Sequence, residues 1–235
     1  MNSQKPVIRL SNVTVSYEPR RPEALTDINL TIDRGDFLAI SGSNGGGKTT
    51  LLRVILKLLK PTSGAVQYFD TDGCPTKHLR IGYLPQKSNI DTRFPITVRE
   101  VILSGLYHKL FNRPGSEEYA RLDEIVALTN TGEFLSQSIG ELSGGQLQRT
   151  LLARAIISKP EVLILDEPLS YVDKRFEQQI YGMVEELAKT TTIILVSHEM
   201  SIISGMANRH IIVERTLTQC HALHHYVPTS DSCPL

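Results

Sequence analysis

Eight consecutive residues, Gly42 to Thr49, constrain this chain more than any other feature. They read Gly-Ser-Asn-Gly-Gly-Gly-Lys-Thr. An apolar run from Phe37 to Ile40 predicts a strand before them, and the pattern from Thr49 to Leu59 predicts a helix that stops at Lys60-Pro61. A strand, a glycine-rich loop and a helix in this order match the P-loop of nucleoside-triphosphate sites. A glycine-rich turn with a chance lysine is the alternative, and both flanking elements disfavour it.

The P-loop predicts how phosphate would be held. Its glycines allow a sharp turn, so that several backbone N–H groups and the helix N-terminus face the anion. Lys48 would reach the β- and γ-phosphate oxygens as a point charge, and the Thr49 hydroxyl would ligate Mg²⁺. A nucleoside triphosphate and Mg²⁺ are therefore the expected ligands. The expected nucleotide contacts are Gly42, Ser43, Asn44, Gly45, Gly46, Gly47, Lys48, Thr49 and Thr50.

A second segment ends in two acids. Val162 to Leu165 is entirely apolar, as the centre of a buried parallel sheet requires, and Asp166 and Glu167 follow it. Ligands of open α/β sheets bind at the carboxyl ends of the strands. We expect Asp166 to support the Mg²⁺ ion and Glu167 to face the attacking water. A strand that merely ends in two acids is the alternative, and the P-loop in the same chain favours the site.

Together with the P-loop, periodicity predicts an α/β fold, a P-loop NTPase core with a mainly parallel sheet, an antiparallel β lobe and a helical insertion. Apolar alternation over Val7 to Tyr17, and again at Ile28, Leu30 and Ile32, indicates the β lobe. Thr97 and Glu100 form a capping-box pattern at the start of helical periodicity that continues to about Leu128. Strands and helices then alternate. The further expected elements are strands 81–84, 192–196 and 210–213, and helices 146–157 and 174–189.

These patterns divide the chain into three parts. Residues 1–86 and 139–217 are expected to form the core with its β lobe, residues 87–138 a helical subdomain, and residues 218–235 a tail without a clear period. The tail contains Cys220, His221, His224, His225 and Cys233, which could bind zinc or another transition metal. A polar end whose histidines are solvated is the alternative, and the incomplete ligand spacing favours it.

Composition excludes several classes of protein. The 25 basic and 25 acidic residues cancel, so no overall positive field would attract nucleic acid. The three scattered cysteines do not resemble a disulfide framework, which favours a reducing compartment. Neither a secretory signal nor a run of roughly 20 apolar residues is visible. We therefore expect a cytoplasmic protein whose membrane role, if any, depends on a partner.

Leu142-Ser143-Gly144-Gly145-Gln146 narrows the class. Ser143 and Gln146 form a capping-box pattern, so the segment predicts a second helix N-terminus with bare glycine amides beside it. With the P-loop upstream and the Asp166 strand just downstream, the sequence resembles the ABC ATPases. The resemblance implies a head-to-tail pair of subunits. ATP on one subunit's Lys48 would be contacted in trans by Ser143, Gly144, Gly145 and Gln146 of the other.

The resemblance also assigns roles to single residues. Tyr17 would stack on adenine, and Gln86 would sense Mg²⁺ or the lytic water. Asp173 would lie in the D-loop along the dimer interface, where Tyr171 and Val172 depart from the usual small residue or leucine. His198 would contact the γ-phosphate and stabilise developing charge. By the same resemblance Glu167 would act on the water as general base or orienter, while Lys48 with Mg²⁺ would hold the phosphate.

The stretch from Ile90 to Val98 resembles the ATPases of the zinc, manganese and iron importer group. That resemblance implies two ATPase copies, a membrane permease dimer and an external metal-binding protein, with the ATPase on the inner face of the cell membrane. The transported metal would never touch this subunit. Two alternatives stay open: an importer ATPase for other cargo, and a soluble ABC ATPase of the iron–sulfur assembly type.

Overall fold

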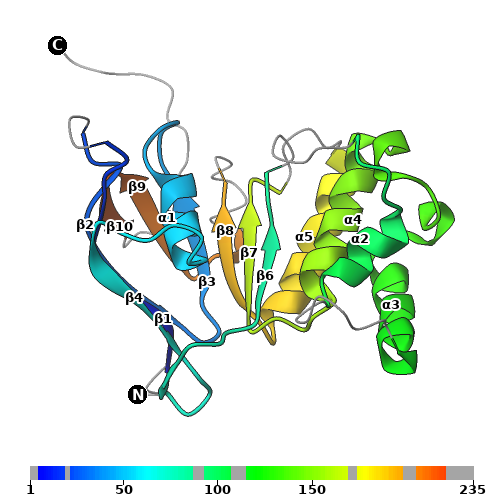
Figure 1. The fold of residues 1–235 in the computed structure, drawn as a ribbon, viewed down its shortest axis with the longest axis horizontal. Coiled ribbons are helices and arrows are strands. Elements are labelled where there is room, and N and C mark those ends of the chain that lie inside the picture. The colour runs from blue at the N-terminus through cyan, green and yellow to red at the C-terminus, as the bar shows by residue number, and fades with distance from the viewer. Residues whose placement is uncertain are drawn as a thin grey trace.

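The computed structural model describes residues 5–18, 22–86, 93–106, 115–168, 174–197 and 205–220, with the side chains of 174–176 set aside. Figure 1 shows an antiparallel sheet at one side, a central sheet, and a group of helices at the other side. This arrangement confirms the predicted α/β fold with a β lobe and helical elements.

The β lobe is a four-stranded antiparallel sheet with the order β2-β1-β4-β5. The alternation in the sequence predicted two of these strands, and in both the apolar side chains are buried. Two further strands were not predicted, because β4 begins with three exposed residues and β5 has only two residues. The strands are β1 (Pro6–Val15), β2 (Leu25–Asp33), β4 (Ser63–Phe69) and β5 (Pro75–Thr76).

The central sheet has six strands in the order β10-β9-β3-β8-β7-β6. All neighbouring strands are parallel except β10, which is antiparallel to β9. The carboxyl ends of β3, β7 and β6 therefore lie at one edge, where the P-loop and the two acids begin. The strands are β3 (Phe37–Ser41), β6 (Ile81–Leu84), β7 (Val162–Asp166), β8 (Thr192–Val196), β9 (Arg209–Glu214) and β10 (Thr216–Cys220).

Helices cover both faces of this sheet, and alternate residues of each strand supply the two cores. Leu38, Ile164 and Ile194 face α1 and the β lobe, whereas Ala39, Leu165 and Leu195 face the helices on the other side. Such alternation is what a sheet buried on both faces requires. The helices are α1 (Lys48–Ile55), α2 (Val98–Ser104), α3 (Ser116–Thr129), α4 (Gly144–Ile156) and α5 (Lys174–Ala188), with 3₁₀ turns at Gly132–Phe134 and Ile139–Glu141.

Several boundaries differ from the sequence prediction, most by one or two residues, and three of the differences change the description of the fold. The helix after the P-loop ends at Ile55 rather than Leu59, because Lys57 takes a left-handed conformation and the Leu58 N–H donates to the Arg53 carbonyl. The continuous periodicity from 97 to 128 contains two separate helices, α2 and α3. Strand β10 reaches Cys220, so residues 218–220 belong to the sheet and not to the tail.

Two predicted capping boxes are confirmed. The Thr97 and Glu100 pair opens α2, and the Ser143 and Gln146 pair opens α4. The Ser143 N–H donates to Gln146 Oε1 at 2.8 Å, and the Gln146 N–H donates to Ser143 Oγ at 3.3 Å. In the described ranges, no helix combines the length and apolar character needed to cross a bilayer.

Candidate active site

The P-loop forms a compact turn between β3 and α1. Lys48 Nζ donates to the carbonyl oxygens of Gly42 at 2.8 Å and Ser43 at 3.0 Å, and so lies folded over the loop. The Gly46 N–H donates to the Ser43 carbonyl at 3.0 Å. These contacts hold the ammonium group inside the loop where phosphate oxygens would bind.

The β9–β10 hairpin supports the loop from behind, which the sequence did not predict. A Cβ atom on Gly42 would lie 2.2 Å from the Val213 carbonyl oxygen, and one on Gly46 would lie 2.6 Å from it. The Arg215 N–H also donates to the Gly46 carbonyl at 2.7 Å. Two of the loop glycines are therefore required by the close approach of this hairpin.

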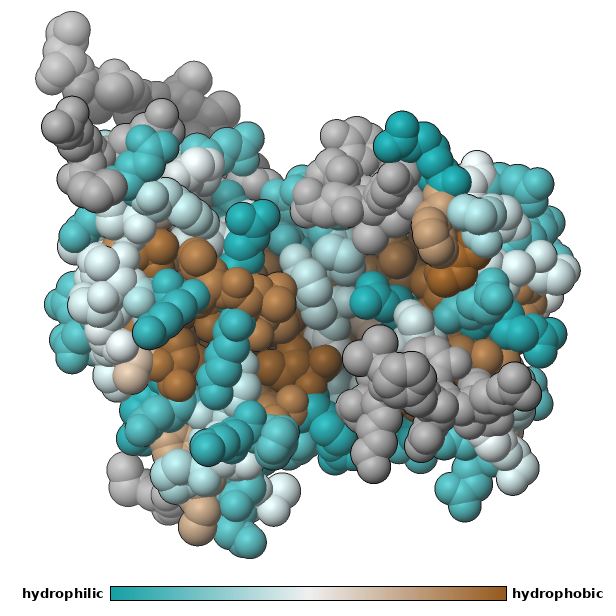
Figure 2. Space-filling view, in the orientation of Figure 1, coloured by the Kyte–Doolittle hydropathy of each residue, from teal (hydrophilic) through white to brown (hydrophobic). Residues whose placement is uncertain are grey.

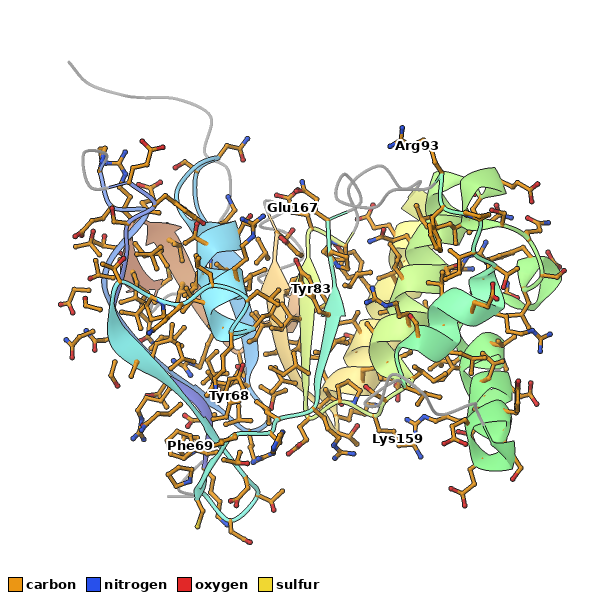
Figure 3. The ribbon with its side chains drawn as sticks, viewed as in Figure 1. Tyr68, Phe69, Tyr83, Arg93, Lys159 and Glu167 are labelled. Atoms are coloured by element: carbon orange, nitrogen blue, oxygen red, sulfur yellow. The ribbon has the colours of Figure 1, made fainter. Side chains whose placement is uncertain are left out.

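The two acids lie at the carboxyl end of β7, as predicted from their position after the strand. Asp166 is 3% exposed, while Glu167 follows in the left-handed region with φ of 49°. The Glu167 N–H donates to the Val196 carbonyl at 3.0 Å, and Gln86 Nε2 donates to Glu167 Oε2 at 2.8 Å. Figure 3 shows Glu167 at the end of the sheet with Tyr83 beneath it. The structure thus brings together the predicted Gln86, Asp166 and Glu167.

Burial sets the electrostatics of these groups. It raises the pKa of Asp166, and the neighbouring Glu167 carboxylate raises it further. Burial also lowers the pKa of Lys48, although both acids oppose that effect. A buried acid beside a second acid favours the binding of a cation, since positive charge stabilises both carboxylates.

One open cleft of about 630 Å³ joins these elements. Tyr17 lies at its rim, 56% exposed, with its hydroxyl 3.1 Å from Thr50 Oγ1. An exposed ring at the rim can stack on a base. The cleft is lined by Tyr17, Ala24, Asn44, Gly45, Gly47, Lys48, Thr49, Thr50, Gln86, Asp166 and Glu167.

The oxygen atoms in this cleft suit Mg²⁺. A hydroxyl of Thr49, an amide oxygen of Gln86 and the carboxylate of Asp166 are hard donors, and Mg²⁺ is usually held by one or two carboxylates together with substrate phosphates and water. Burial and the Glu167 carboxylate raise the pKa of Asp166, and a cation bound beside it would oppose both effects.

Ser143 to Gln146 are absent from the residues that line the cleft, and the site formed by one chain therefore lacks the predicted contact of the signature. Two predicted residues, Asp173 and His198, lie outside the described residues, as do residues 221–235 of the tail. In the portion described, no group of three or more His, Cys, Asp or Glu could hold a metal ion.

Two residues near the acids were missed by the sequence prediction. Tyr83 on β6 donates its hydroxyl to Asp166 Oδ2 at 3.4 Å, and burial raises its pKa to about 12. Gln148 on α4 donates to the Pro168 carbonyl at 2.5 Å. Tyr83 lies in a short strand that predicts packing, and Gln148 lies among polar residues at the start of a helix, so only the three-dimensional arrangement places them beside the site.

A P-loop after β3, with two acids at the same edge of the sheet at the end of β7, one strand further than β8, defines a P-loop ATPase. Comparison with known proteins gives the family: residues 25–170 match the ABC transporter family model. The chain therefore belongs to the ABC transporter family, and the ATPase class and fold predicted from the sequence are confirmed.

Curated relatives and solved structures agree with this assignment. The zinc uptake system ATP-binding protein ZurA of Listeria innocua is 35% identical, over 94% of this chain and 89% of its own. The zinc import ATP-binding protein ZnuC of Pasteurella multocida is 37% identical, over 89% and 74%. The dimeric structure of MJ0796, a bacterial ABC transporter cassette, is 27% identical with a TM-score of 0.79, over 93% of this chain and all of its own.

Proposed function

We propose that this protein is the ATP-hydrolysing subunit of a metal-ion importer, and that two copies enclose ATP head to tail while a separate permease carries the ion. The ATPase part of the proposal rests on one observation. The same cleft is lined by Lys48, Gln86, Asp166 and Glu167. The relatives named for zinc uptake and zinc import supply the cargo class. Zinc, manganese and iron are the candidate ions.

Phosphate binding would use the loop amides and Lys48. The Lys48 ammonium now bonds two carbonyl oxygens of its own loop, so phosphate oxygens would replace these partners with stronger, charge-assisted ones. Tyr17 would stack on the adenine at the open rim. Mg²⁺, held by Thr49, Gln86 and Asp166, would neutralise charge on the phosphates.

Glu167 would orient the attacking water or accept its proton. Gln86 Nε2 donates to its carboxylate at 2.8 Å, and this contact supports a role for Gln86 in sensing Mg²⁺ or the attacking water beside the proposed base. Gln86 follows β6, so a shift of this segment would alter the hydrogen bonding of the base. His198 is proposed to contact the γ-phosphate from the loop after β8.

A second copy of the chain would complete the site. The N-terminus of α4 is a second anion-binding end, with Ser143 as its cap and Gly144 and Gly145 in its first turn. Because these residues do not line their own chain's cleft, we assign them to nucleotide held by the partner. Such a pair of isologous contacts gives a symmetric dimer.

The permease would dock in the groove between the lobes. This groove of about 610 Å³ runs along the edge strand β6, and Figure 2 shows apolar surface beside a hollow between the two halves of the molecule. Its lining is basic and apolar, which suits a permease segment with carboxylates beside apolar side chains. The lining includes Leu56, Lys57, Lys77, Leu79, Arg80, Tyr83 and Arg154.

The proposed partners place the protein on the inner face of the cell membrane. Residues 87–138 would form the helical subdomain that transmits closure to the permease, and 1–86 with 139–217 the ATPase core. An external metal-binding protein would deliver the ion to the permease, and no nucleic acid takes part.

Glu167→Gln tests the ATPase part. The variant keeps the shape of the side chain but loses the base, so we expect ATP binding to persist while turnover falls by about 100-fold or more. Size-exclusion chromatography with ATP should then show an accumulating dimer. Near-normal turnover of this variant would contradict the assignment of Glu167.

Co-purification with membranes tests the transport part. We expect a hydrophobic permease to copurify with the protein. We also expect membrane vesicles that contain this complex to take up zinc, manganese or iron. Capture of soluble assembly proteins instead would favour the iron–sulfur alternative, and uptake of another solute would change the cargo.

A further inference from the structure

Gln148, on the first turns of α4, is the feature that the proposed mechanism leaves unused. Its side chain is 2% exposed, and its Nε2 donates to the Pro168 carbonyl oxygen at 2.5 Å. A carbonyl oxygen only accepts hydrogen bonds, so the amide nitrogen must point toward Pro168 and the amide oxygen must point away. Within the described ranges, that Oε1 atom is buried without a donor.

This hydrogen bond fixes the Pro168 carbonyl group, one residue beyond the proposed hydrolytic Glu167. Pro168 directly follows Glu167, whose φ of 49° is disfavoured for a residue with a side chain. Such a conformation persists only where surrounding contacts fix it. Here two hydrogen bonds fix the backbone. On the N-terminal side, the Glu167 N–H donates to the Val196 carbonyl of β8 at 3.0 Å, and on the C-terminal side Gln148 of α4 donates to the Pro168 carbonyl.

The position of Gln148 on α4 gives this bond a wider consequence. The helix begins at Gly144 under the cap of Ser143, and Gln148 lies just over one turn later. The helix start is the end assigned to nucleotide on the partner chain, whereas Glu167 lines its own chain's cleft. One short helical segment therefore lies between the two nucleotide sites of the dimer.

We infer that Gln148 is a positioning residue which couples the two sites: it sets the Glu167 backbone, through the Pro168 carbonyl, according to the position of α4. Nucleotide bound at the α4 N-terminus would thereby adjust the hydrolytic glutamate that serves the other nucleotide. The inference rests on the proposed head-to-tail dimer. A buried amide oxygen without a donor also costs folding free energy, which argues that the side chain does more than stabilise the fold.

Gln148→Met tests the inference, because methionine has a similar length and no amide. We expect kcat to fall on the order of 10- to 100-fold, as for a displaced catalytic group, while the KM for ATP stays within about two-fold. The Hill coefficient for ATP should also fall toward one. Thr150→Val is the matched control, since Thr150 is fully buried on the same helix and its hydroxyl donates to the Gln146 carbonyl of that helix at 2.9 Å.

A double-mutant cycle separates positioning from a general structural role. If Gln148 acts through Glu167, Gln148→Met causes no further loss of single-turnover phosphate release in the Glu167→Gln background. An equal fold-loss in both backgrounds, or an equal loss in Thr150→Val, would overturn the positioning role. A lower kcat with an unchanged Hill coefficient would overturn the coupling between sites.

Failure of the proposed dimer gives a different result. If Glu167→Gln forms no dimer with ATP, the head-to-tail arrangement is wrong, and with it the coupling between sites. The cycle between Gln148 and Glu167 would still be non-additive in the isolated chain, because both residues belong to it.

Discussion

His210 is a buried titratable group directly beneath the P-loop. Its side chain is 5% exposed, and its Nε2 lies 2.8 Å from Ser41 Oγ, one residue before the loop begins. Burial lowers the pKa of His210 below the ordinary value of 6.5. The unfolded chain then binds more protons than the folded chain at acidic pH, so the free energy of unfolding decreases as the pH falls through about 6.5.

His210→Gln should reduce this pH dependence. The glutamine amide can still bond Ser41 but stays neutral, so the free energy of unfolding from urea titrations should fall less between pH 7.5 and 5.5 than in the wild type. His78→Gln is the control, because the His78 side chain is exposed and its replacement should leave the wild-type slope. A variant slope equal to that of the wild type would contradict the prediction for His210.

The P-loop and the β9–β10 hairpin act as one element. Gly42 and Gly45 both have positive φ, at 141° and 81°, but only Gly42 would place a Cβ against the Val213 carbonyl oxygen. Gly42→Ala should therefore displace the loop from the hairpin and abolish ATP binding by calorimetry. Gly45→Ala has open space around its Cβ, so we expect backbone strain of about 1 kcal/mol and weakened binding that remains measurable. Equal losses in the two variants would show that close packing on the hairpin is unimportant.

The elements that sequence predicted are those with a strong local signal. Strand β7, which is apolar from Val162 to Leu165, and the two capping boxes were found because each depends on neighbouring residues. The support of Gly42 by Val213, and of Pro168 by Gln148, joins residues far apart in the chain, so no local pattern reports it. Strand β10 was also missed, because its polar residues are ordered by pairing with β9 rather than by a core.

At the scale of the whole molecule, the proposed dimer would make each chain contribute to two half-sites, one at the start of α1 and one at the start of α4. Lys48 at the start of α1 and Gly144 at the start of α4 would meet only across a dimer interface. Lys48→Ala and Gly144→Asp should each abolish turnover alone. The second change adds a carboxylate that repels phosphate, although an acid in the first turn suits the helix itself.

Mixing these two inactive variants should restore hydrolysis. Half of the dimers in an equal mixture are mixed, and each mixed dimer has one intact site, with the P-loop of the Gly144→Asp chain facing the α4 end of the Lys48→Ala chain. About a quarter of the wild-type rate is expected if two-fold pairing is random and the two sites act independently. A lower but measurable rate is expected if Gln148 couples the sites, because the second site of each mixed dimer has a defective P-loop. Mixing Lys48→Ala with Glu167→Gln should restore no hydrolysis. Lys48 and Glu167 line the same chain's cleft, so each of the two sites in a mixed dimer still contains one of the two substitutions. Phosphate release that recovers in the first mixture alone would show that α4 completes the partner's site. If neither mixture recovers phosphate release, α4 does not complete that site.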